Sequence, residues 1–128
     1  MQVVIVDDSA IVRRRLAEML RHVARVTVAG EAGSVAEALA TIPLLRPDVV
    51  VLDLHLPDGD GVAVLESVKR IVPAPVVVML SNYADDFYRT WCKAAGADFF
   101  LDKAKQFDEL PGLLSRVMKS AVEDNGAR

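Results

Sequence analysis

The feature that most constrains the fold is a five-fold alternation between short apolar runs and stretches with helical periodicity. The short runs are rich in β-branched residues and lack a polar face, which is typical of strands buried on both sides of a parallel sheet. They cover residues 3–6, 26–29, 49–52, 76–80 and 99–101. Apolar residues spaced three or four apart predict helices over 12–23, 34–42, 64–71, 85–95 and 108–121. This order predicts an α/β fold, a three-layer doubly wound (βα)5 architecture with helices on both faces of a five-stranded parallel sheet.

Local signals define several of the expected helix ends. Ser34 and Glu37 have the spacing of a capping box at the start of the second helix, and Pro43 is expected to end that helix. Gly96 is expected to end the fourth helix, and Pro111 is tolerable because it falls in the first turn of the fifth.

Length and composition limit the class of protein. The chain has 128 residues, 52% of them hydrophobic, which is enough for one domain with its own core. We place this domain at 1–121, followed by a polar C-terminal tail at 122–128. A net charge of −3 gives no general electrostatic reason to bind nucleic acid directly or to bind an anionic membrane. The single cysteine, Cys92, excludes an internal disulfide, and no apolar stretch is long enough to span a membrane. We expect a cytoplasmic protein.

Polar residues follow four of the five predicted strands. Asp7 and Asp8 follow the first strand, Asp53 the third, Ser81 the fourth, and Lys103 the fifth. The carboxyl ends of parallel strands meet at one edge of a sheet, so these side chains are expected to share a cleft. Three carboxylates and one ammonium leave two negative charges uncompensated, which favours a divalent cation. Because the candidate ligands are oxygen atoms, Mg²⁺ and phosphoryl chemistry are the expectation.

Four motifs at these positions resemble response-regulator receiver domains of two-component signalling, of the chemotaxis-regulator type. They are VDDS at 6–9, VLDLHLPDGDG at 51–61, MLSN at 79–82 and GADFFLDK at 96–103. The resemblance extends from the first strand through the fifth helix, and the spacing of all four motifs agrees with it. It implies a flavodoxin-like sheet with strand order 2-1-3-4-5.

The resemblance also implies a phosphorylation site. Asp53 matches the phosphoacceptor, whose carboxylate becomes an acyl phosphate. Asp8, Asp53 and the backbone carbonyl of His55 match the direct ligands of Mg²⁺, and Asp7 matches the residue that acts largely through metal-bound water.

Three further matches concern the response to phosphorylation. Lys103 matches the lysine that pairs with the phosphoryl oxygens, and Ser81 matches the hydroxyl that moves to bond them. Phe100 matches the aromatic residue that turns inward together with this hydroxyl. The resemblance implies that this pair changes the face built from the fourth helix, fifth strand and fifth helix.

The chain departs from the usual family pattern near the site. Asn82 follows the switch hydroxyl where a small residue is usual, and Ala104 follows the lysine where a cis proline is usual. A cis bond before Ala104 is improbable, so the geometry of that loop and the timing of the switch are open. His55 and Tyr83 lie two residues past Asp53 and Ser81; both are bulky, and we expect them to slow the access of hydrolytic water.

The implied partners are a sensor histidine kinase or a histidine phosphotransfer protein, and a downstream protein target or output domain. A phosphorylation-dependent homodimer is a further possibility. The chain is expected to catalyse its own modification rather than turn over a separate substrate. Three alternatives remain. One is a receiver cut from a longer DNA-binding regulator, and another is a degenerate receiver that is not phosphorylated. The third is a phosphohydrolase of the haloacid dehalogenase type, which would need Asp where this chain has His55.

Overall fold

The computed structural model describes residues 1–126 of the chain. Its elements are β1 (Gln2–Val6), α1 (Ala10–Arg21), β2 (Thr27–Ala32), α2 (Val35–Leu45), β3 (Val49–Leu52), β4 (His55–Leu56), β5 (Gly59–Asp60), α3 (Gly61–Lys69), β6 (Val76–Ser81), α4 (Asp86–Ala94), β7 (Phe99–Asp102), a 3-10 turn (Phe107–Glu109) and α5 (Leu110–Gly126). No helix within residues 1–126 combines the length and the apolar character needed to cross a membrane.

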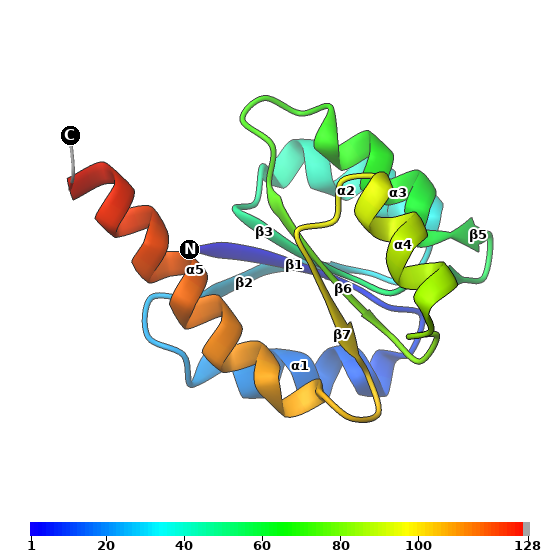
Figure 1. Ribbon diagram of the computed structural model, residues 1–128, viewed down its shortest axis with the longest axis horizontal. Helices are drawn as coiled ribbons and strands as arrows, with labels where there is room; N and C mark the ends of the chain where they lie inside the picture. Colours follow the sequence, from blue (N-terminus) through cyan, green and yellow to red (C-terminus); the bar gives the residue numbers. More distant parts are fainter. Residues whose placement is uncertain (127–128) are drawn as a thin grey trace.

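The five longer strands form one parallel sheet in the order β2-β1-β3-β6-β7. Numbered among themselves, these strands have the order 2-1-3-4-5, so the expected topology is confirmed. Helices α2, α3 and α4 cover one face of the sheet, and α1 and α5 cover the other (Figure 1). Successive residues of a strand point to opposite faces. Val4 and Val6 accordingly pack in the core below α2–α4, whereas Val3 and Ile5 pack in the core below α1 and α5.

The second helix does not end at Pro43, so that expectation was wrong. Ser34 caps the helix as expected, because its hydroxyl accepts a hydrogen bond from the Glu37 N–H at 3.1 Å. The helix nevertheless continues to Leu45. Arg46 is its C-cap: it has a left-handed backbone (φ 46°) and donates its N–H to the Ile42 carbonyl. Pro43 lies in the last turn, where its missing N–H removes only one bond at the end of the helix.

The last helix is also longer than expected. A 3-10 turn precedes α5, which starts at Leu110 with Pro111 in its first turn and continues to Gly126 rather than ending near Ala121. The segment 121–125 contains neither glycine nor proline, so nothing in it stops the helix before Gly126. The helical part of the expected polar tail is therefore 122–126, and 127–128 lie outside the described residues. The domain boundary at 121 stays a prediction.

A small hairpin, β4–β5, shapes the loop that follows β3. It pairs His55 with Asp60, and Asp60 then caps α3 by accepting from the N–H groups of two residues in its first turn. At the tip of the hairpin, Asp58 accepts hydrogen bonds from the N–H groups of Val35 and Ala36, at 2.7 and 3.0 Å. These bonds lower the pKa of Asp58 and fasten the loop to the N-terminus of α2. The loop after Asp53 is thus held at the tip of its hairpin and at its C-terminal end.

Candidate functional site

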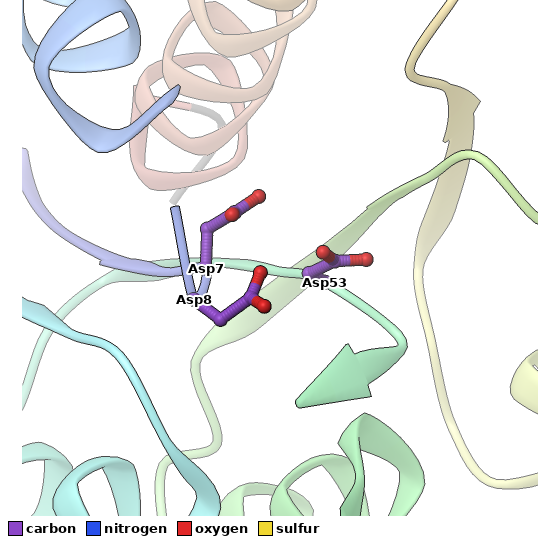
Figure 2. Close-up of side chains that lie close together, drawn as sticks. All are labelled: Asp7, Asp8 and Asp53. Carbon is purple, nitrogen blue, oxygen red and sulfur yellow. The ribbon is translucent and has the colours of Figure 1, made fainter. Parts of the chain in front are cut away.

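Three carboxylates from two neighbouring strands meet at the carboxyl edge of the sheet. Asp7, Asp8 and Asp53 each offer one oxygen, and these oxygens lie within 4.8 Å of one another (Figure 2). Sheet-like hydrogen bonds hold two of the backbones: the Asp7 N–H donates to Ala32 and the Asp53 N–H donates to Val6, at 3.0 and 2.9 Å. Asp7 and Asp53 are buried, whereas Asp8 is exposed. The site is therefore an acidic cluster with two buried carboxylates and one, that of Asp8, exposed to solvent.

Lys103 connects two of these carboxylates. Its Nζ lies 2.7 Å from Asp7 Oδ2 and 2.9 Å from Asp53 Oδ2, and its side chain is only 12% exposed. The Lys103 N–H donates to the Ser81 carbonyl at 2.8 Å, which continues the β6–β7 ladder by one residue and aims the side chain at the cluster. The structure thus brings Lys103 together with the three aspartates, as the strand-end pattern predicts.

The electrostatics of the cluster follow from burial and from the ion pairs. Burial raises the pKa of Asp53, and the Lys103 hydrogen bond and charge oppose this only in part, while Asp7 raises the pKa further. Burial alone would lower the pKa of Lys103, but its bonds to Asp7 and Asp53 outweigh that effect and leave the pKa raised. Lys103 therefore stays protonated, and the three aspartates exceed it by two negative charges when ionised. A divalent cation would balance this charge.

Ser81 and Tyr83 form the next part of the site. Ser81 is fully buried at the end of β6, and its hydroxyl accepts a hydrogen bond from the Tyr83 N–H at 3.0 Å. The Tyr83 ring stacks on the His55 ring with a centroid distance of 3.9 Å and an interplanar angle of 24°. The side chain of His55 is thus turned toward Tyr83 and is not part of the carboxylate cluster. The expected role of its backbone carbonyl as a ligand stays a prediction.

The comparisons with known proteins decide the family. The family model described as response regulator receiver domain matches residues 3–115. The chain belongs to this family. The DNA-binding transcriptional activator DevR/DosR of Mycobacterium tuberculosis is 37% identical over 126 residues, which make up 98% of this chain and 54% of that protein.

Two further matches agree with this assignment to the receiver family. A protein-glutamate methylesterase/protein-glutamine glutaminase of Carboxydothermus hydrogenoformans is 38% identical over 92% of this chain and 35% of its own. The receiver thus spans 54% and 35% of the length of these two relatives. Among solved structures, the response regulator domain of Thermotoga maritima CheB has a TM-score of 0.82 at 25% identity, with 96% of both chains covered. The expected flavodoxin-like receiver fold is confirmed.

Sequence reasoning missed an arginine that supports the acidic loop of the receiver. Arg13 of α1 donates from Nη1 to the Asp7 carbonyl at 2.7 Å and from Nε to Glu31 at 3.1 Å. It therefore ties the end of β1 to both α1 and β2. A basic run at 13–15 is visible in the sequence, but no spacing rule indicates which of the three arginines turns toward the site.

The loop after Lys103, whose geometry the sequence left open at Ala104, is held by side chains. The Asp102 carboxylate accepts from the N–H groups of Ala104 and Lys105, at 2.9 and 3.3 Å. The Gln106 side-chain oxygen accepts from the Asp102 N–H at 2.8 Å. A cis peptide bond occurs at Val72–Pro73, and the Lys103–Ala104 bond is trans. The Asp102 turn thus shapes the loop without a proline.

Proposed function

We propose that this receiver accepts a phosphoryl group on Asp53 from a phosphohistidine of a sensor histidine kinase or a histidine phosphotransfer protein. The observation that carries the proposal is the pair of contacts from Lys103 to Asp7 and Asp53 beside the exposed Asp8. An oxygen of Asp53 forms a bond to phosphorus while the bond from phosphorus to the donor imidazole breaks. The electron pair of that bond stays on the imidazole nitrogen.

The residues present fit a magnesium ion. The donor set is made of carboxylate oxygens within 4.8 Å of one another, which suits a hard cation that keeps several waters. Asp8 and Asp53 would hold the ion directly with the His55 carbonyl, and Asp7 would hold its water. When bound, Mg²⁺ supplies positive charge against the phosphoryl oxygens.

Lys103 and Ser81 carry the response of the chain itself. Lys103 moves its hydrogen bond from the Asp53 carboxylate to the phosphoryl oxygens and stabilises the charge that they bring. Ser81 turns its hydroxyl to the phosphoryl group, and Phe100 moves with it. We propose that this changes the face made of α4, β7 and α5, to which a downstream protein, an output domain or a second copy of the chain binds.

The stacked rings of His55 and Tyr83 bear on the lifetime of the acyl phosphate. They lie two residues beyond the phosphoacceptor and the switch hydroxyl, and their centroids are 3.9 Å apart. A stacked pair is harder to displace than either ring alone. We propose that the pair restricts the approach of water to phosphorus, so that the phosphoryl group is lost slowly. The chain then acts as a cytoplasmic switch and not as an enzyme that turns over a separate substrate.

The test is incubation with acetyl phosphate and Mg²⁺, followed by intact mass measurement. Wild type should gain the mass of one phosphoryl group, and Asp53→Asn should gain none. Asp108→Asn, a substitution of an exposed acid in the 3-10 turn, is the matched control and should behave as wild type. No mass gain in wild type would favour a receiver that works without phosphorylation. Release of free phosphate from many small phosphoesters would favour a phosphohydrolase.

A second candidate is the receiver part of a longer regulator with an output domain. The observation that favours it is the coverage of the two relatives, since the matched regions make up 54% of a DNA-binding activator and 35% of a methylesterase. Reading the open reading frame beyond codon 128 tests this candidate directly.

A further inference from the structure

Arg89 of α4 contacts three separate segments of the receiver. Its Nε donates to the Ala84 carbonyl at 2.8 Å, in the loop between β6 and α4. Its Nη1 donates to the Phe100 carbonyl on β7 at 3.2 Å, and its Nη2 lies 3.5 Å from the Gln106 side-chain oxygen in the loop after β7. The guanidinium carbon also lies 4.9 Å from the centroid of the Phe100 ring. We call these four residues the Arg89 latch.

The acceptors of the latch are all uncharged. Among the ion pairs of residues 1–121, none involves Arg89. Its charge is stabilised by two backbone carbonyls, an amide oxygen and a ring face. The side chain is half-buried. Only the planar fork of a guanidinium can serve three acceptors and a ring at once. The position of Arg89 is therefore determined by the segments that it joins.

The latch is directly connected to the switch residues. On one side, Ala84 lies three residues after Ser81, whose hydroxyl accepts from the intervening Tyr83 N–H at 3.0 Å. On the other side, Gln106 makes two hydrogen bonds to the backbone of Asp102, at 2.7 and 2.8 Å, next to Lys103. A rotation of the Ser81 hydroxyl toward Asp53 would break this bond to the Tyr83 N–H, one residue before the Ala84 carbonyl that Arg89 binds.

We propose that Arg89 is a positioning residue that holds Phe100 and the two flanking loops in the resting arrangement and must release them when Asp53 is phosphorylated. This inference rests on the proposed function. Contacts that exist in only one of two arrangements bias the equilibrium toward it by their own free energy. Removing the guanidinium should therefore favour the arrangement that binds a phosphoryl group, without any change in the residues that touch that group.

The experiment titrates beryllofluoride, a mimic of a phosphoryl group on a carboxylate, in the presence of Mg²⁺. The fluorescence of Trp91, the single tryptophan of the chain, reports binding because it lies on α4. Arg89→Ala should lower the half-saturating concentration about five-fold, the effect of losing roughly one net hydrogen bond. Arg89→Lys keeps the charge but not the fork and should give a smaller decrease.

The matched control is Lys93→Ala, which removes an exposed cation from the next turn of α4. It should leave the half-saturating concentration unchanged. An Arg89→Ala value equal to or higher than that of wild type would overturn the proposal, as would an equal decrease in Lys93→Ala.

A second measurement does not depend on phosphorylation. Without beryllofluoride, Arg89→Ala should accelerate amide hydrogen exchange at 82–85 and 102–106 while exchange in β1 and β3 stays as in wild type. Unchanged exchange in both loops would overturn the latch. If wild type shows no response to beryllofluoride, the proposed phosphorylation of Asp53 fails, and the exchange data alone decide whether Arg89 holds the loops.

Discussion

Replacing Lys103 with methionine removes the ammonium group that lies between two buried carboxylates. The Lys103, Asp7 and Asp53 side chains are 12%, 3% and 10% exposed, and Nζ lies 2.7 and 2.9 Å from the two carboxylates. Removing one partner of a buried ion pair costs about 3–5 kcal/mol, because the other charge stays buried and unpaired. The neighbouring Asp8 is exposed to solvent, so we expect the lower end of this range, about 3 kcal/mol, and a decrease in Tm of about 10 °C.

Urea denaturation followed by circular dichroism measures this loss, with and without Mg²⁺. Mg²⁺ should stabilise Lys103→Met more than wild type, because the ion then has no ammonium group to compete with at the carboxylates. The control is Lys105→Met, an exposed lysine two residues on, which should change the free energy of unfolding by less than about 0.5 kcal/mol. Equal stability of Lys103→Met and wild type without Mg²⁺ would contradict the electrostatics described for the carboxylate cluster.

Three further predictions concern the surroundings of the site. His55→Ala and Tyr83→Ala should each shorten the lifetime of the phosphorylated form, measured by intact mass after removal of acetyl phosphate; unchanged lifetimes would exclude the stacked pair as a barrier to water. Asp58→Ala should lower the free energy of unfolding at neutral pH, measured by urea denaturation. Folding lowers the pKa of Asp58, so the difference between variant and wild type should vanish as the pH falls through the folded-state pKa. Gly61→Ala should destabilise the fold by more than about 2 kcal/mol in urea unfolding, because the added Cβ would overlap a backbone oxygen of the loop after β3. Gly112→Ala is the control: the space around Gly112 is open, so this variant should be as stable as wild type or more stable.

The fold and the acidic cluster could be predicted because they depend on rules that act along the chain. Five short apolar runs separated by helices specify a parallel sheet, and a parallel sheet brings its carboxyl ends to one edge. Asp7, Asp53 and Lys103 therefore meet although Lys103 is 96 residues from Asp7. The strand order itself came from the resemblance to receivers, since periodicity does not rank the neighbours of a strand.

The supporting contacts could not be predicted, because they join side chains to atoms of residues that are distant in sequence. Asp58 caps a helix 22–23 residues earlier, and Arg89 reaches the Gln106 side chain 17 residues later. Such bonds depend on rotamers and on the distance between elements, which no spacing rule encodes. The wrong prediction at Pro43 has a different cause. A proline in the last turn removes only one backbone hydrogen bond, and the helix continues for two more residues.

The central claim is that Asp53 is the residue that carries the phosphoryl group, and chemical trapping tests it most directly. Borohydride reduces an aspartyl phosphate to homoserine, which peptide mapping by mass spectrometry locates within the chain. After reaction with acetyl phosphate and Mg²⁺, we expect homoserine at position 53 and unmodified aspartate at positions 7 and 8. Homoserine at position 7 or 8, or phosphorylation that leaves position 53 unmodified, would contradict it.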